Sequence, residues 1–76
     1  MPPLPIISAK EFIKFLQSKG FFFVRQKGSH QRYKHPNGMV ITIPVHDKKP
    51  LKRGLLNAIL NELNISVEEL LDFLNR

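Results

Sequence analysis

Residues 30–44 read HQRYKHPNGMVITIP, and the turn at the centre of this stretch determines how the chain folds. Pro36 suits the first central position of a type I turn, and Gly38 suits the left-handed residue that follows it. The pattern therefore predicts a hairpin with a three-residue loop and a bulge. The predicted register pairs His35 with Met39, Tyr33 with Ile41 and Gln31 with Ile43.

Side chains alternate between the two faces of a strand, so this register assigns every hairpin residue to a face. The core face receives the apolar residues Tyr33, Met39, Ile41 and Ile43. His35 falls at the rim of that face, where we interpret it as a turn residue with local hydrogen bonds. The opposite, exposed face carries His30, Arg32, Lys34 and Thr42. The same parity, continued along the chain, places His46 on the exposed face near His30.

A helix and a first strand are predicted before the hairpin. Ser8 and Glu11 form a capping box, and the apolar spacing behind them predicts a helix over residues 9–19. Gly20 supplies its C-terminal stop. The aromatic and β-branched run FFFV at 21–24 then predicts a strand that leads into a basic segment.

Two further helices are predicted after the hairpin. Pro44 lacks a backbone donor, so the third strand should lie at an edge of the sheet or end there. Apolar spacing predicts an amphipathic helix from about residue 52, and a capping box at 66–69 opens a short last helix. We therefore predict one α+β domain over residues 1–76 in the order α-β-β-β-α-α. Its three-stranded antiparallel sheet should pack on the helices.

The composition restricts the class of protein. A chain of 76 residues with 42% hydrophobic residues suffices for one small domain with a single core. It contains no cysteine, which excludes disulfides and cysteine-based zinc sites. No apolar run approaches the ~20 residues of a membrane span, and the N-terminus lacks the pattern of a secretory signal. We therefore expect a cytoplasmic protein that does not associate with membranes.

Basic residues dominate the charge. Twelve Lys and Arg against six Asp and Glu give a formal net charge of +6, which favours a polyanionic partner. A first cation cluster comprises Arg25, Lys27, Arg32 and Lys34, and a second comprises Lys48, Lys49, Lys52 and Arg53. Most of the acidic residues lie toward the C-terminus. This separation is typical of a directional binding face, and a solvated basic surface without a ligand is the alternative.

His30 is the leading candidate for chemistry. Metal-free RNA cleavage needs a base for the 2′-hydroxyl proton, an acid for the leaving 5′-oxygen, and cations that stabilise the phosphorane charge. An exposed imidazole can transfer a proton at neutral pH, and His30 is flanked by cations on its face. His46 is the candidate for the second proton-transfer group. Gly28 and Ser29 leave room for a phosphate, because nothing bulky precedes His30.

Other residues in these segments have simpler readings. The three histidines do not indicate a metal site, because Asp47 is the only other ligand residue in their segment and zinc sites usually have tighter spacing. We expect no cofactor either. Tyr33 is interpreted as core rather than as a platform for a base. The cations of the second cluster interact unfavourably with the dipole at the N-terminus of the helix that follows. A phosphate bound there would make the interaction favourable, because it would contact both the helix amides and the cations. A mobile loop explains that cluster equally well.

The run GFFFVRQKGSHQRYKHPNGMVITIPVHDKKPLKRGLLNAIL contains the motifs GSH, HPNG and IPVH. On these motifs and their spacings, nearly the whole chain resembles the HicA family of small toxins, which are mRNA interferases of toxin–antitoxin pairs. It implies a fold like the double-stranded-RNA-binding domain and RNA cleavage with His30 of GSH as the essential catalytic residue. It also implies a HicB-type antitoxin that covers this surface. The chain departs from the family at Leu55, where a threonine often follows the glycine.

Three hypotheses describe the function. The first is an RNA endonuclease toxin that uses His30, with Ser29 and both cation clusters binding mRNA. This toxin would be a monomer within a hetero-oligomeric complex with its antitoxin. The second is a non-catalytic RNA-binding module of the same fold, and the third is an interaction protein whose basic face fits an acidic protein.

Overall fold

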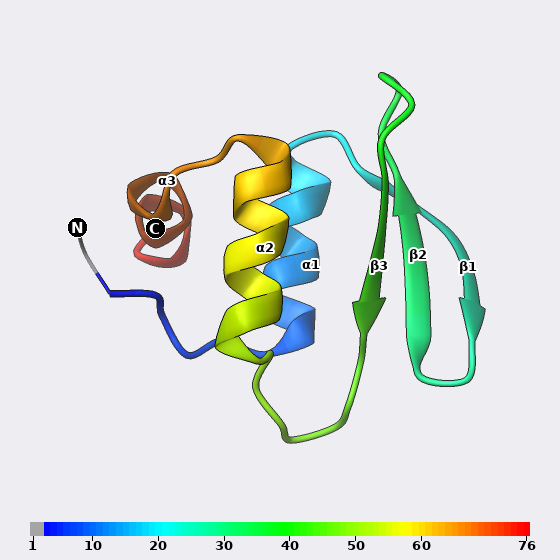
Figure 1. Ribbon diagram of the computed structural model, residues 1–76, viewed down its shortest axis with the longest axis horizontal. Coiled ribbons are helices and arrows are strands. Elements are labelled where there is room, and N and C mark those ends of the chain that lie inside the picture. The colour runs from blue at the N-terminus through cyan, green and yellow to red at the C-terminus, as the bar shows by residue number, and fades with distance from the viewer. Residues whose placement is uncertain (1–2) are drawn as a thin grey trace.

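The computed structural model describes residues 3–76 and has the predicted order of elements (Figure 1). These elements are α1 (Ala9–Ser18), β1 (Phe22–Lys27), β2 (His30–Lys34), β3 (Val40–Pro44), α2 (Arg53–Leu63) and α3 (Val67–Leu74). The strands form one antiparallel sheet with β2 between β1 and β3. All helices lie on one side of this sheet, and no described element covers its other face (Figure 1). The predicted α+β class is therefore confirmed.

The predicted hairpin between β2 and β3 is also confirmed. The backbone N–H of His35 donates to the carbonyl oxygen of Met39 over 2.9 Å and closes the loop. Gly38 adopts a φ of +97°, the left-handed conformation that the bulge requires. The strands then pair in the expected register, Tyr33 with Ile41 and Gln31 with Ile43. β3 lies at an edge of the sheet and ends at Pro44, as expected.

The core lies between the inner face of the sheet and the helices. Tyr33, Ile41 and Ile43 are at most 4% exposed, and they belong to one apolar cluster with residues of α1 and α2. The most deeply buried helix residues are Phe12, Phe15, Leu16, Leu56, Leu60 and Leu70, the last of which belongs to α3. Each large apolar side chain buried in this way contributes about 1.5–3 kcal/mol. Met39 is half-buried at the margin of the cluster rather than inside it.

The capping boxes differ between the first and last helices. Before α1, Ser8 Oγ accepts from the Glu11 N–H, and Glu11 Oε1 accepts from the Ser8 N–H, each over 3.2 Å. Before α3, Ser66 Oγ accepts from the Glu69 N–H over 3.1 Å. The carboxylate of Glu69 forms an ion pair with Lys19 at the end of α1 instead of returning to Ser66. The second predicted box is therefore only half formed, because Lys19 competes for the same carboxylate.

The first strand is longer than the predicted segment at 21–24. β1 continues to Lys27 and contains a bulge between Phe23 and Arg25. Gly28 and Ser29 then form a two-residue turn that joins Lys27 to His30. Gly28 has a φ of +59° and Ser29 a negative one, as in a type II′ turn. The sequence pattern predicts only room for a phosphate at these residues, and the turn is an addition from the structure.

Tyr33 couples the stability of the fold to alkaline pH. Its side chain is buried, and desolvation raises the pKa of its hydroxyl above the usual value of about 10. A pKa that is higher in the folded state stabilises the fold fully below pH ~10, and this contribution is lost as the pH rises through the folded-state pKa. We expect the free energy of unfolding in urea to fall above pH ~10, and Tyr33→Phe to flatten this fall.

The two proteins differ only at residue 33, so the difference between their alkaline slopes isolates Tyr33. Tyr33 is the single tyrosine of the chain, and tyrosinate absorbance therefore follows its ionisation directly. Equal alkaline slopes for wild type and Tyr33→Phe would contradict the prediction.

Candidate nucleic-acid interface

The face of the sheet that points away from the helices carries the first cation cluster. Residues that pair directly across two strands share a face, and Arg25 pairs with Arg32 while Lys27 pairs with His30. Lys34 lies on the same face of β2, and all five side chains are exposed. The ion pair between Lys19 and Glu69 involves none of them, and no other ion pair forms among residues 3–76. Like charges therefore stand side by side on adjacent strands without a described counter-charge.

A groove of about 510 Å³ lies on this face at the end where β2 begins. It is lined by Arg25, Lys27, Gly28, His30, Arg32 and Thr42. Its volume falls within the ~300–1,000 Å³ of typical ligand sites. The structure thus brings the predicted catalytic histidine together with three of the predicted RNA-binding cations. Ser29 lies beside the groove in the turn, and Lys34 lies farther along β2.

Apolar side chains surround Lys34 at the other end of this face. Phe22 and Val40 both pair with Lys34, and they are 48% and 44% exposed. Val24, at the bulge of β1, is 45% exposed. The sequence predicts strands at these apolar residues but does not predict that their side chains are exposed. The run FFFV could have indicated this exposure, because successive side chains of a strand point to opposite faces and only one face of this sheet is covered.

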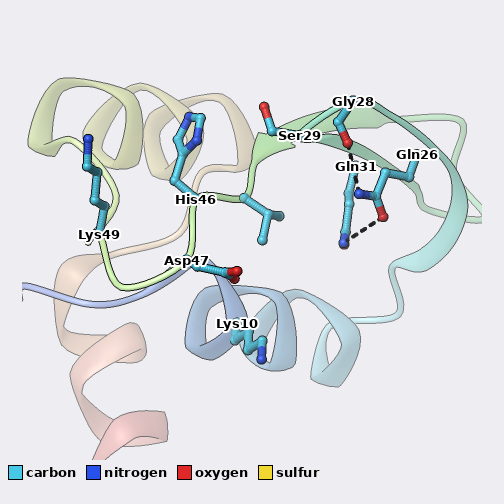
Figure 2. A pocket seen from close by; sticks show the side chains of 9 residues that line it. Lys10, Gln26, Gly28, Ser29, Gln31, His46, Asp47 and Lys49 are labelled. Carbon is cyan, nitrogen blue, oxygen red and sulfur yellow. Dashed lines mark hydrogen bonds between the residues drawn. The ribbon is translucent and has the colours of Figure 1, made fainter.

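His46 lies in a different groove from His30. Strand parity does not extend to His46, because β3 ends at Pro44. The second groove, of about 620 Å³, lies behind the Gly28–Ser29 turn (Figure 2). Its polar lining residues are Lys10, Gln26, Ser29, Gln31, His46, Asp47 and Lys49. The two grooves share Gly28 alone, and the role of His46 as a second proton-transfer group stays a prediction.

The second cation cluster gathers around His46 rather than around His30. Lys49 and Lys52 line one hollow together with His46, and Lys48 lines another with it. All four cations of the cluster are exposed, and Arg53 is the first residue of α2. Lys52 occupies the N-cap position of α2 without a side-chain hydrogen bond to the helix. The first turn of α2 is therefore uncapped by a side chain, and a phosphate site at this turn stays a prediction.

His35 has a structural role that matches its interpretation as a turn residue. The Asn37 N–H donates to His35 Nδ1 over 3.1 Å, which places the ring proton on Nε2. This Nε2–H donates to the carbonyl oxygen of Lys19 over 3.0 Å. The ring also packs edge-on against Phe21, with the ring centroids 5.0 Å apart. His35 thus ties the β2–β3 loop to the end of α1, and both of its nitrogens are engaged.

Metal-binding clusters and membrane spans are absent from residues 3–76. No three histidine or acidic side chains come together in a way that could hold a metal ion. None of the helices has both the length and the apolar character needed to cross a bilayer.

These features define a class of protein, a small α+β domain whose open sheet face presents a histidine among cations. The sequence model of the family described as HicA toxin of bacterial toxin-antitoxin matches residues 9–65, which is more than half of the chain. The protein therefore belongs to the HicA toxin family, and the resemblance seen in its sequence is confirmed. A comparison with curated proteins finds no match. Membership of the family makes the chain a toxin of a toxin–antitoxin system and implies an antitoxin partner.

Proposed function

We propose that this toxin cleaves mRNA as a metal-independent endoribonuclease and that a HicB-type antitoxin neutralises it. The observation that carries the proposal is the direct pairing of Arg25 with Arg32, and of Lys27 with His30, on adjacent strands. Like charges directly opposite each other, here those of Arg25 and Arg32, destabilise a sheet. A phosphate bound between them turns this repulsion into charge-assisted hydrogen bonds. The open face is therefore suited to a polyanion, and the proposed substrate places the toxin in the cytoplasm.

His30 is the proposed proton-transfer group at the reacting phosphate. In the proposed step, the 2′-hydroxyl oxygen attacks the adjacent phosphorus and its proton passes to a base. The bond from phosphorus to the 5′-oxygen breaks as an acid protonates that oxygen, which leaves a 2′,3′-cyclic phosphate and a 5′-hydroxyl. The guanidinium groups of Arg25 and Arg32 stabilise the phosphorane charge between these events. His46 is the candidate for the second proton-transfer group. Because His46 and His30 line different grooves that share Gly28, this role requires that the RNA cross the turn at Gly28.

The remaining cations are proposed to hold the RNA on either side of the scissile phosphate. Lys34 extends the first cluster along β2, and Ser29 offers a hydroxyl beside His30. The second cluster, formed by Lys48, Lys49, Lys52 and Arg53, extends the basic surface past the second groove. Binding through so many phosphate contacts should weaken steeply as salt rises.

The HicB-type antitoxin is proposed to cover the open face of the sheet. An acidic surface on the antitoxin would complement the first cation cluster and steer association. Phe22, Val24 and Val40 add exposed apolar area beside Lys34, and aromatic side chains in such positions often dominate binding energy. Coverage of this face would exclude RNA from His30, so inhibition would occur by occlusion. The toxin would act as a monomer within the hetero-oligomeric complex.

A non-catalytic RNA-binding module of the same fold is the alternative function. Its motivation is that the groove at His30 holds cations sufficient for phosphate binding without any chemistry. The two functions differ in one measurement, because only an enzyme retains RNA binding and loses turnover when His30 is removed.

Metal independence provides the test of the proposed reaction. The purified toxin is expected to cleave single-stranded RNA in the presence of EDTA, because the proposed proton transfers and cations need no metal. The products should carry 2′,3′-cyclic phosphate or 3′-phosphate ends, which mass spectrometry of a defined oligonucleotide identifies. The matching DNA oligonucleotide lacks the 2′-hydroxyl and serves as the control. A strict requirement for a divalent ion, or equal cleavage of DNA, would refute the mechanism.

A further inference from the structure

A continuous chain of hydrogen bonds runs from the core to the turn before His30. Figure 2 shows its last two bonds, which join Gln31 to Gln26 and Gln26 to Gly28. The hydroxyl of Tyr33 donates to Gln31 Oε1 over 2.8 Å. Gln31 Nε2 donates to Gln26 Oε1 over 3.3 Å, and Gln26 Nε2 donates to the carbonyl oxygen of Gly28 over 2.9 Å. The chain therefore connects a buried residue on β2 with an exposed turn that leads directly into His30.

The orientation of both amides in this chain is fixed by its last member. The Gly28 carbonyl can only accept a hydrogen bond, so Gln26 must turn its NH₂ group toward Gly28 and its oxygen toward Gln31. Gln31 must then donate to Gln26 and present its own oxygen to Tyr33. The Tyr33 hydroxyl supplies the required donor, because the ordinary tyrosine pKa of about 10 leaves it protonated at neutral pH and burial raises that pKa further. Flipping either amide would set two acceptors or two donors against each other.

The turn that leads into His30 is held through the carbonyl groups of both of its residues. The Gly28 carbonyl accepts from Gln26, and the Ser29 carbonyl accepts from the Val45 N–H over 2.7 Å. His30 pairs on the β3 side with Pro44 at a position of the antiparallel ladder where facing residues exchange no backbone hydrogen bonds, because the bond lies at the neighbouring pair of Ser29 and Val45. On this side the position of His30 therefore depends on the hydrogen bond of the turn residue Ser29.

We propose that Gln26 and Gln31 are positioning residues, which hold the Gly28–Ser29 turn and thereby fix the direction of the His30 side chain in its groove. This inference rests on the proposed function, in which His30 transfers a proton. Neither glutamine lines the groove of His30, because both lie on the inner side of the turn in the second groove. The hydrogen bonds of Gln26 are exposed, so they contribute little to global stability and their effect is local.

Gln26→Met tests the proposal, because methionine keeps the length of the side chain and removes the amide, with both its donor and its acceptor. The matched control is Gln17→Met, since Gln17 is exposed on α1 and its side chain makes no described hydrogen bond. Tyr33→Phe is a second variant, which releases the far end of the chain and leaves the bond from Gln26 to Gly28. Thermal unfolding by circular dichroism verifies that each variant folds.

Two readouts are compared across these variants. The first is nuclear magnetic resonance of the turn, namely hydrogen exchange of the Ser29 and His30 amides and the χ1 rotamer populations of His30. The second is the kcat and KM for a single-stranded RNA oligonucleotide. Gln26→Met should speed exchange in the turn and spread the His30 rotamers. It should also lower kcat by about tenfold or more, since a misplacement of ~1 Å can cost ~10²-fold. KM should stay within about twofold of wild type, because the phosphate-binding cations are retained.

The outcomes separate this inference from the proposed function. If wild type fails to cleave RNA, the proposed function is wrong, and the exchange and rotamer data alone decide whether the glutamines position His30. Unchanged exchange and rotamers in Gln26→Met would overturn the inference whatever the activity. A mobile turn with unchanged kcat would overturn it as well, because His30 would then work without the support. Wild-type behaviour of Gln17→Met and an intermediate effect of Tyr33→Phe are the expected results.

Discussion

Replacement of His30 by alanine is expected to abolish RNA cleavage and to leave the fold intact. The side chain is exposed in the groove of the open face, so its removal creates no cavity in the core. Loss of a general acid or base lowers the rate by at least ~10²-fold. Single-turnover cleavage of an RNA oligonucleotide measures this loss, and thermal unfolding verifies the fold.

RNA affinity distinguishes the enzyme from the non-catalytic module. His30→Ala should still bind RNA with nearly the wild-type dissociation constant, because Arg25, Lys27 and Arg32 remain in the groove. His46→Ala is the matched variant in the second groove. A comparable loss of rate there would assign His46 to the second proton transfer, and a wild-type rate would remove it from the mechanism. A wild-type rate in His30→Ala would refute the central assignment.

The double variant Arg32→Glu with Lys34→Glu should associate far more slowly with the antitoxin than wild type does. Each substitution replaces a positive charge with a negative one and lowers the net charge by two, so the formal net charge falls from +6 to +2. Electrostatic steering raises association rates by 10- to 10³-fold at low salt, so we expect a loss of about tenfold or more. Stopped-flow association at two salt concentrations measures the effect, which should shrink as salt rises. RNA binding should weaken in parallel.

A matched control separates the position of the charges from their sum. Lys14→Glu with Arg76→Glu changes the net charge equally, but these exposed residues lie on the helical side of the domain. This control should associate nearly as fast as wild type. If the variant at Arg32 and Lys34 did so too, the antitoxin would dock elsewhere, and occlusion of the open face would be the wrong explanation of inhibition.

The hairpin between β2 and β3 could be predicted because two independent constraints agree on it. The turn chemistry of Pro36 and Gly38 sets a loop length, and that length buries Ile41 and Ile43 together. A register shifted by one residue would turn both isoleucines toward water. The same alternation predicts that the cations of β2 and the His30 side chain lie on the opposite face. This part of the candidate site is formed by residues close together in the sequence, and the sequence alone therefore predicts it.

The rest of the site depends on features that break the alternation. The bulge in β1 between Phe23 and Arg25 interrupts the period of two, which hides the continuation of the strand to Lys27. The chain leaves the sheet after Pro44, so parity cannot locate His46. The glutamine chain behind the turn requires Gln26 and Gln31 to be cross-strand partners, which is known only once the register of β1 is fixed.

The position of β1 at the edge of the sheet has a consequence for the behaviour of the free toxin in solution. Phe22, Phe23 and Val24 are about half exposed on a strand with one unpaired side, and such strands favour self-association through edge-to-edge pairing. The bulge and the charges of Arg25 and Lys27 shorten the flat part of this edge. We therefore expect self-association of the free toxin to begin at this short apolar segment, and a partner that covers the segment would prevent it.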